Sequence, residues 1–116
     1  MLYKLLMKSY VIDQLRPADY EKIKICLNER YGPADLGGIY WLPMDSSIYS
    51  TVQASHIQCR PFYFALDLEP DKLACELLVR TKHRIRCECI CYASETQRNW
   101  LIQTVDAMFS DLDITV

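Results

Sequence analysis

Apolar side chains recur along this chain at two spacings, one typical of helices and the other typical of strands. Tyr20, Ile23, Leu27 and Tyr31 lie three or four residues apart, which predicts a helix that begins at Pro17 and ends before Gly32-Pro33. A second helix is predicted to begin after Ser94, because Gln97 three residues later completes a capping box. Its apolar stripe consists of Trp100, Leu101, Val105, Met108, Phe109 and Leu112.

Strict alternation of apolar and polar residues predicts two adjacent strands over residues 61–69 and 72–80. The connecting sequence EPDK predicts a tight turn in which Glu69 lies opposite Lys72 and Leu66 lies opposite Cys75. This register places the apolar residues of both strands on the same face of the hairpin. Weaker patterns predict strands over residues 8–13 and 39–42 and a helix over residues 47–58, ending before Arg60-Pro61.

The sequence RIRCECICYA, residues 84–93, alternates in the same way and predicts a third strand. Ile85, Cys87, Cys89 and Cys91 then share one face, where a cysteine packs as a small hydrophobic residue. Alternate positions of a strand lie about 7 Å apart, too far for a disulfide, and zinc usually takes its thiolates from turns. We therefore expect Cys75, Cys87 and Cys89 to be buried core thiols, and we expect no metal and no cofactor.

These elements occur in the order β-α-β-α-β-β-β-α, which predicts an α+β fold. We expect a single domain over residues 1–116, with a mainly antiparallel sheet and helices packed mostly on one face. Residues 1–7 can be regarded as a dispensable N-terminal extension, because Met7 offers an alternative start.

Composition and charge restrict the possible functions. The chain has 116 residues, of which 51% are hydrophobic and 24% charged, as in ordinary globular proteins. A formal net charge of -2 makes nucleic acid an improbable partner. No stretch approaches the roughly 20 apolar residues of a membrane span, and Lys4 and Lys8 interrupt the apolar start, so we expect no membrane partner and a cytoplasmic location. In that compartment the six cysteines are expected to be free thiols.

A cluster of positive charge lies at the predicted turn between residues 72–80 and 84–93. It contains Arg80, Lys82, Arg84 and Arg86. Such a basic tip is consistent with a site for a small anion or an acidic partner, but also with a solvated turn whose charges prevent aggregation. One register pairs Arg80 with Glu88, Leu78 with Ile90 and Glu76 with Tyr92.

That register also places apolar side chains on the sheet face away from the helices. They are Tyr63, Leu78, Ile90 and Tyr92. An apolar band on a solvent-facing sheet favours a protein partner, a ligand groove, a covering segment such as the N-terminal stretch, or a homodimer. A non-catalytic binding or adaptor module that uses this face and the basic tip is our leading functional hypothesis.

The sequence HIQC provides an alternative hypothesis. His56 and Cys59 are three residues apart and would share one face of a helix, where a nearby strand thiolate could complete a metal site or a Cys–His nucleophile pair. This favours a small thiol-based enzyme, a metal site or a redox sensor centred on these two residues. No fourth ligand is identifiable, and the common nucleotide, zinc-protease and thioredoxin motifs are absent from the sequence, so enzymatic activity stays open.

Overall fold

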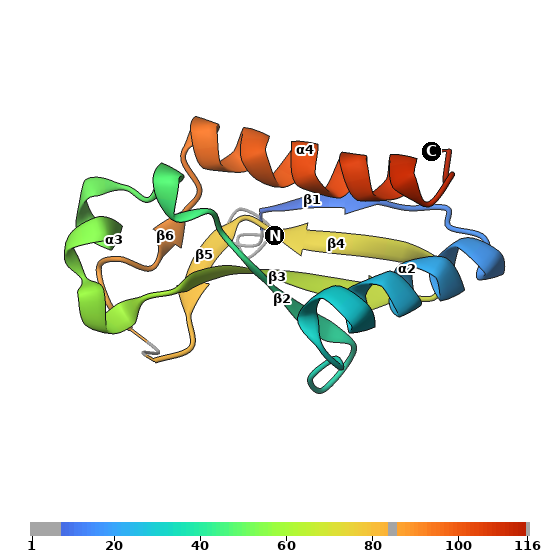
Figure 1. Cartoon of the computed structure of the whole chain (residues 1–116), viewed down its shortest axis with the longest axis horizontal. Helices are drawn as coiled ribbons and strands as arrows, with labels where there is room; N and C mark the ends of the chain where they lie inside the picture. The colour runs from blue at the N-terminus through green and yellow to red at the C-terminus, as the bar shows by residue number, and fades with distance from the viewer. Residues whose placement is uncertain (1–7, 84–85, 116) are drawn as a thin grey trace, which may run out of the picture.

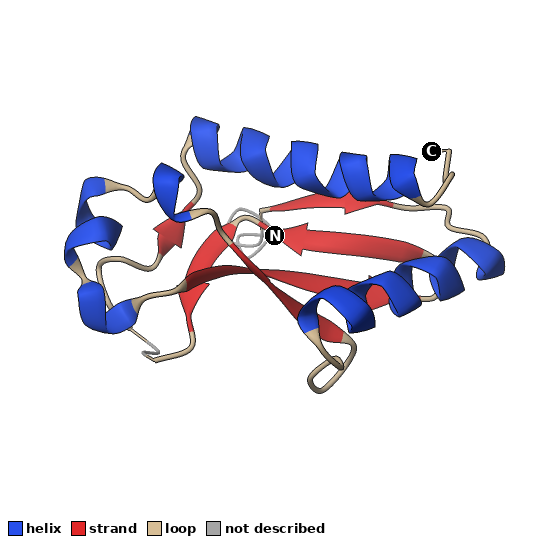
Figure 2. Cartoon of the chain, viewed as in Figure 1, coloured by secondary structure: helices blue, strands red, loops and turns tan. Residues whose placement is uncertain are grey.

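The chain folds into an antiparallel sheet with its two long helices on one face (Figure 1). A computed structural model describes residues 8–83 and 86–115. In chain order the elements are β1 (Ser9–Ile12), α2 (Pro17–Tyr31), β2 (Ile39–Pro43), the 3-10 helix η1 (Ser46–Ile48), α3 (Thr51–Ser55), the 3-10 helix η2 (Ile57–Cys59), β3 (Phe62–Glu69), β4 (Lys72–Glu76), β5 (Leu78–Thr81), β6 (Cys91–Tyr92) and α4 (Glu95–Asp111). Figure 2 shows their distribution, with the short helices gathered at one end of the sheet.

Strand β3 is the centre of the sheet. It pairs with β2 along one side, and with β4 and then β5 along the other. Leu77 separates β4 from β5, and at this residue the outer neighbour changes from β1 to β6. The N–H of Leu77 donates to the carbonyl of Lys8, while its own carbonyl accepts from the N–H of Ala93. All these pairs are antiparallel.

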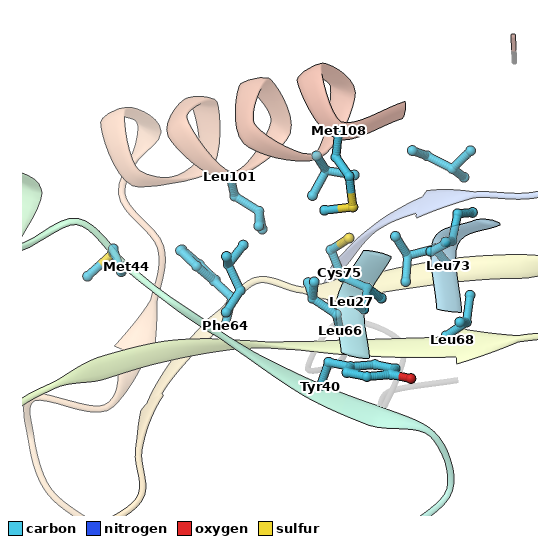
Figure 3. Close-up of a cluster of buried hydrophobic side chains, with 14 of the residues drawn as sticks. Leu27, Tyr40, Met44, Phe64, Leu66, Leu68, Leu73, Cys75, Leu101 and Met108 are labelled. Atoms are coloured by element: carbon cyan, nitrogen blue, oxygen red, sulfur yellow. The ribbon is translucent and has the colours of Figure 1, made fainter. Parts of the chain in front are cut away.

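The core lies between this sheet and the two long helices. Alternate residues of β3 point into it: Phe62, Phe64, Leu66 and Leu68. Helix α2 contributes Ile23 and Leu27, and α4 contributes Leu101, Val105 and Met108, all of them buried. Figure 3 shows Leu101 and Met108 directed from α4 toward the sheet residues. The ring of Trp100 stacks on that of Phe64 at a centroid distance of 6.1 Å.

The α+β architecture and its main elements agree with the sequence prediction. Helix α2 begins at Pro17, and α4 begins with the predicted box in which Ser94 and Gln97 cap each other. The β3–β4 hairpin has the predicted register, with Glu69 opposite Lys72. Within the described ranges, no helix is both long enough and apolar enough to cross a bilayer.

The single helix predicted over residues 47–58 is wrong. Ser50 accepts a hydrogen bond from the N–H of Gln53 and starts a new helix after η1. At His56, φ of -89° and ψ of 69° leave the helical region, so η2 is separate from α3. The segment therefore makes three short turns in place of one rod, because local side-chain caps compete with continuation of the helix.

The strand predicted over residues 84–93 is also wrong. Residues 84–85 lie outside the described ranges, residues 87–90 form a turn closed by the Ile90 N–H on the Cys87 carbonyl, and only Cys91–Tyr92 is a strand. Leu78 consequently faces Tyr92, where Ile90 was expected. Arg80 pairs with Glu76 at 2.6 Å, where Glu88 was expected.

Candidate metal centre

Four side chains that can bind metal converge where α3 and η2 meet the turn before β6. They are His56, Cys59, Cys87 and Cys89. One ligand atom from each lies within 4.8 Å of the other three, so a single ion can contact all four. In Figure 1 this is the end of the sheet marked by α3 and β6. The alternative sequence hypothesis named His56 and Cys59 and expected one unnamed thiolate beside them, and the structure brings two thiols, Cys87 and Cys89, to this pair.

The separation of the Cys59 and Cys87 sulfurs suits a tetrahedral ion of the size of zinc. Cys59 Sγ and Cys87 Sγ lie 3.9 Å apart, and two sulfurs at about 2.3 Å from a tetrahedral Zn²⁺ are about 3.8 Å apart. His56 presents Nδ1 to the same point, at 3.1 Å from Cys87 Sγ. All six cysteines of the chain are free thiols, so none of these sulfurs is engaged in a disulfide.

Hydrogen bonds hold the backbone of each cysteine ligand in place. The Thr81 hydroxyl at the end of β5 donates to the Cys59 carbonyl. The Ile90 N–H donates to the Cys87 carbonyl at 3.0 Å. Gln53 Nε2 donates to the Cys89 carbonyl at 3.3 Å. Three different parts of the chain thus fix the three sulfurs, and such supporting bonds keep metal ligands in position.

His56 is oriented by a carboxylate on its far side. Glu88 Oε1 lies 3.4 Å from His56 Nε2, while Nδ1 faces the sulfurs. Histidine ligands of metal sites commonly donate their second ring N–H to a carboxylate, which fixes the tautomer and makes the other nitrogen a better ligand. The arrangement of Cys87, His56 and Glu88 equally suits a thiolate activated by a histidine and an acid.

The thiol groups differ in how readily they lose a proton. Hydrogen bonds from the backbone and side chain of Cys89, together with a contact to His56, lower the pKa of Cys87 to about 7. Burial raises the pKa of Cys89 to about 12. Both effects belong to the metal-free cluster, because a bound cation favours the thiolate form of every ligand.

A cavity of about 480 Å³ opens beside the cluster. It is lined by Ser55, His56, Ile57, Gln58, Cys59, Arg86 and Cys87. Cys87 is half-buried, whereas Cys59 and Cys89 are buried, so Cys87 is the cysteine of the cluster most accessible to solvent. Arg86 contributes positive charge at this opening, where three thiolates outweigh the charge of one divalent ion.

The expectation that Cys75, Cys87 and Cys89 are buried core thiols is confirmed for Cys75 and Cys89, which are fully buried in the core, whereas Cys87 is only half-buried against it. Cys75 is fully buried on β4, and burial raises its pKa to about 12. Cys87 and Cys89 both lie in the turn of residues 87–90 that follows the basic tip, and Cys91 is exposed. The single residue between Cys87 and Cys89 is shorter than the two to four residues typical of paired zinc cysteines, so no spacing signal distinguished these two from cysteines of a strand.

The basic tip, residues 80–86, is only partly close to the cluster. Arg86 reaches the cavity, while Arg80 lies on β5 in its ion pair with Glu76. Lys82 Nζ lies 4.6 Å from the centre of the Tyr63 ring, in a cation–π contact. Arg84 falls outside the described residues. The tip therefore holds cations in at least three separate environments.

The outer face, meaning the sheet face opposite the helices, carries three of the four predicted apolar residues. Tyr63, Leu78 and Tyr92 are half-exposed, and on β3 and β5 they alternate with buried residues. Ile90 packs against the core, so its predicted place in the band is wrong. Sequence reasoning missed Trp41 on β2, whose ring lies 6.3 Å from that of Tyr63. Its alternation with the buried Tyr40 and Leu42 was the available signal.

Comparison with known protein families finds no match for this chain. Comparisons with curated proteins and with solved structures likewise find no significant match. The chemistry of the candidate metal centre therefore rests on its own residues.

Proposed function

We propose that this chain is a zinc-stabilised binding module. In this proposal a Cys3His centre, formed by His56, Cys59, Cys87 and Cys89, fastens the basic tip to the α3–η2 segment. The tip and the outer face then hold a protein or a small anionic partner. The convergence of four ligand atoms within 4.8 Å is the observation that carries the proposal.

The donor set favours zinc over other common ions. Three thiolates and one imidazole are soft and borderline ligands, which suit Zn²⁺, whereas Mg²⁺ and Ca²⁺ prefer oxygen. Four protein ligands also fill a tetrahedral shell and leave no position for substrate, as in structural zinc sites. A structural role is therefore favoured over catalysis by the metal.

The binding role draws its support from positive charge that no ion pair between described residues neutralises. Lys82 and Arg86 are exposed and form no ion pair with another described residue, unlike Arg80. Fixed cations next to exposed aromatic rings offer a partner both orientation and contact area. A metal that fixes Cys87 also fixes Arg86, its neighbour in sequence.

Metal analysis of purified protein tests the metal centre. Protein purified from cells without added metal is expected to contain about one zinc ion per chain, measured by inductively coupled plasma mass spectrometry. Cys89→Ser removes a ligand and is expected to abolish stoichiometric binding. Cys91→Ser is the matched control, since Cys91 lies two residues away and outside the cluster. Metal-free wild-type protein that cannot be loaded with zinc would contradict the proposal.

A thiol-based enzyme is the second candidate, supported by the alignment of Cys87, His56 and Glu88 beside a cavity. Its nucleophile would be Cys87, activated by His56. Two further thiols so close to a nucleophile argue against this function, because they provide partners for unwanted disulfide formation.

Alkylation kinetics separate the two candidates. A zinc ligand reacts slowly with iodoacetamide until a chelator removes the metal, whereas an activated nucleophile reacts rapidly at neutral pH with or without the chelator. We expect Cys87 to be modified rapidly only when the chelator is present, and peptide mass spectrometry measures the extent of this modification. Rapid modification that is unaffected by chelator, and that slows in Glu88→Gln, would favour the enzyme.

A further inference from the structure

The four ligands of the proposed metal centre are unequally protected. Cys87 is half-buried and lines the cavity of about 480 Å³, together with Cys59. Cys89 is fully buried and is not among the lining residues. A small solute that enters the cavity therefore reaches Cys87, and the sulfur of the buried Cys59 lies only 3.9 Å from that of Cys87.

We propose that the centre is a redox switch in which a hydroperoxide oxidises Cys87 and Cys59 to a disulfide and releases the zinc ion. The inference rests on the metal centre proposed above and assigns a regulation to it. Its geometric basis is that both cysteines line the cavity, that Cys87 is half-buried there, and that the two sulfurs are close enough to pair after a small movement of either side chain.

The chemistry balances in two steps. The Cys87 thiolate attacks one peroxide oxygen and breaks the O–O bond, which gives a sulfenic acid on Cys87 and leaves hydroxide or alkoxide. The Cys59 thiolate then attacks the Cys87 sulfur, forms the S–S bond and displaces hydroxide. Two protons from solvent neutralise the two oxygen anions. The two thiolates supply both electrons that reduce the peroxide, so the oxidation state of Zn²⁺ does not change. The ion is released because two of its four ligands are lost.

Oxidation exchanges one cross-link for another. Cys59 follows α3, while Cys87 follows β5, and 28 positions separate them in the sequence. The metal and the disulfide join the same two segments, so the tip stays attached in both states. Cys89 and His56 lose their shared ion, and the turn that carries Glu88 and Cys89 loses that restraint.

Peroxide titration of the zinc-loaded, reduced full chain tests the switch. A chromogenic chelator follows zinc release, and peptide mass spectrometry without reduction maps disulfides. We expect hydrogen peroxide to release about one zinc ion for each Cys59–Cys87 disulfide formed, and dithiothreitol with added zinc to reverse both changes. Cys91→Ser tests the nearest exposed thiol and is expected to behave like the wild type.

The outcomes distinguish the switch from the metal centre beneath it. If the reduced protein binds no zinc, both proposals are overturned. If it binds zinc but keeps it after peroxide treatment, or if the disulfide includes Cys91 or Cys89, the switch alone is overturned. Cys59→Ser, loaded with zinc where it still binds, is expected to form no disulfide at Cys87.

Discussion

Gln53 and Gln97 form a buried amide pair that connects the proposed metal centre to the last helix. Gln97 Nε2 donates to Gln53 Oε1 at 2.9 Å, and Gln53 Nε2 donates in turn to the Cys89 carbonyl. Each glutamine is also the N3 residue of a capping box, Gln53 in α3 and Gln97 in α4. A single polar network inside the protein thus connects two helix starts and the backbone of one proposed metal ligand, Cys89.

Substitution of Gln53 by alanine is expected to weaken zinc binding by about 10–100-fold, the usual effect of removing a supporting partner of a metal ligand. The Cys89 carbonyl loses its donor, and the start of α3 loses half of its capping box. Competition with a chelator of known affinity measures the change.

Gln103→Ala is the control for this experiment, because Gln103 is an exposed glutamine on α4. It is expected to leave zinc affinity unchanged. An affinity in Gln53→Ala equal to that of the control would show that the network does not support the centre.

Trp100→Ala is expected to lower the free energy of unfolding by about 2–3 kcal/mol, below the range for fully buried aromatics. Trp100 stacks on Phe64 but stays half-exposed, so part of the ring is already in water. Denaturant melts measure the loss, with Thr96→Ala on the exposed side of α4 as a control expected to change stability by less than about 0.5 kcal/mol. A loss below about 1 kcal/mol would mean that the ring contributes little to the core.

Asp19 is expected to make stability depend on pH in the acid range. A hydrogen bond from the Arg16 side chain lowers the pKa of Asp19 below its ordinary value of 3.8. The ionised carboxylate therefore stabilises the fold above pH 3.8, and this contribution is lost as the pH falls from there through the lower pKa of the folded state. Asp19→Asn lacks the contribution throughout.

Melts between pH 2 and pH 7 should therefore show the difference between the wild type and Asp19→Asn shrinking as the pH decreases. Glu21→Gln removes one negative charge from an exposed position of the same helix and serves as the control. A difference that is independent of pH would assign the effect to packing of Asp19.

Charge reversal at the tip tests the proposed binding surface. Arg86→Glu is expected to weaken binding of an acidic partner, because it replaces an attractive charge by a repulsive one. Tyr92→Ala is expected to weaken binding because contact area on the outer face is lost. Pull-down and analytical sedimentation of folded variants measure partner binding and oligomeric state. Should both variants keep every partner and the same oligomeric state, the tip and the outer face are only solvated surface.

The helices and the hairpin could be predicted because their signals are local. The stripe that begins at Trp100 and the cap at Ser94 lie within one helix, and the β3–β4 register follows from a tight turn. Alternation failed for residues 84–93, because a turn stabilised by the Ile90 N–H on the Cys87 carbonyl has no distinct hydrophobic period.

Only two residues of the candidate metal centre could be predicted from the sequence, again because only local signals are visible there. His56 and Cys59 are close in sequence, and their spacing was enough to single them out. Cys87 and Cys89 meet them only through the pairing of β3 with β5 and through the turn of residues 87–90. A correct prediction needed that turn in place of the strand expected over residues 84–93.

The ligands of the centre bracket the middle of the sheet, with His56 and Cys59 before β3 and Cys87 and Cys89 after β5. If β5 slipped by two residues against β3, the later ligands would move by about 7 Å relative to the earlier ones. That displacement exceeds the 4.8 Å within which all four ligand atoms now lie. Binding of an ion would therefore report the strand register, because only chains with correctly paired strands could retain the ion.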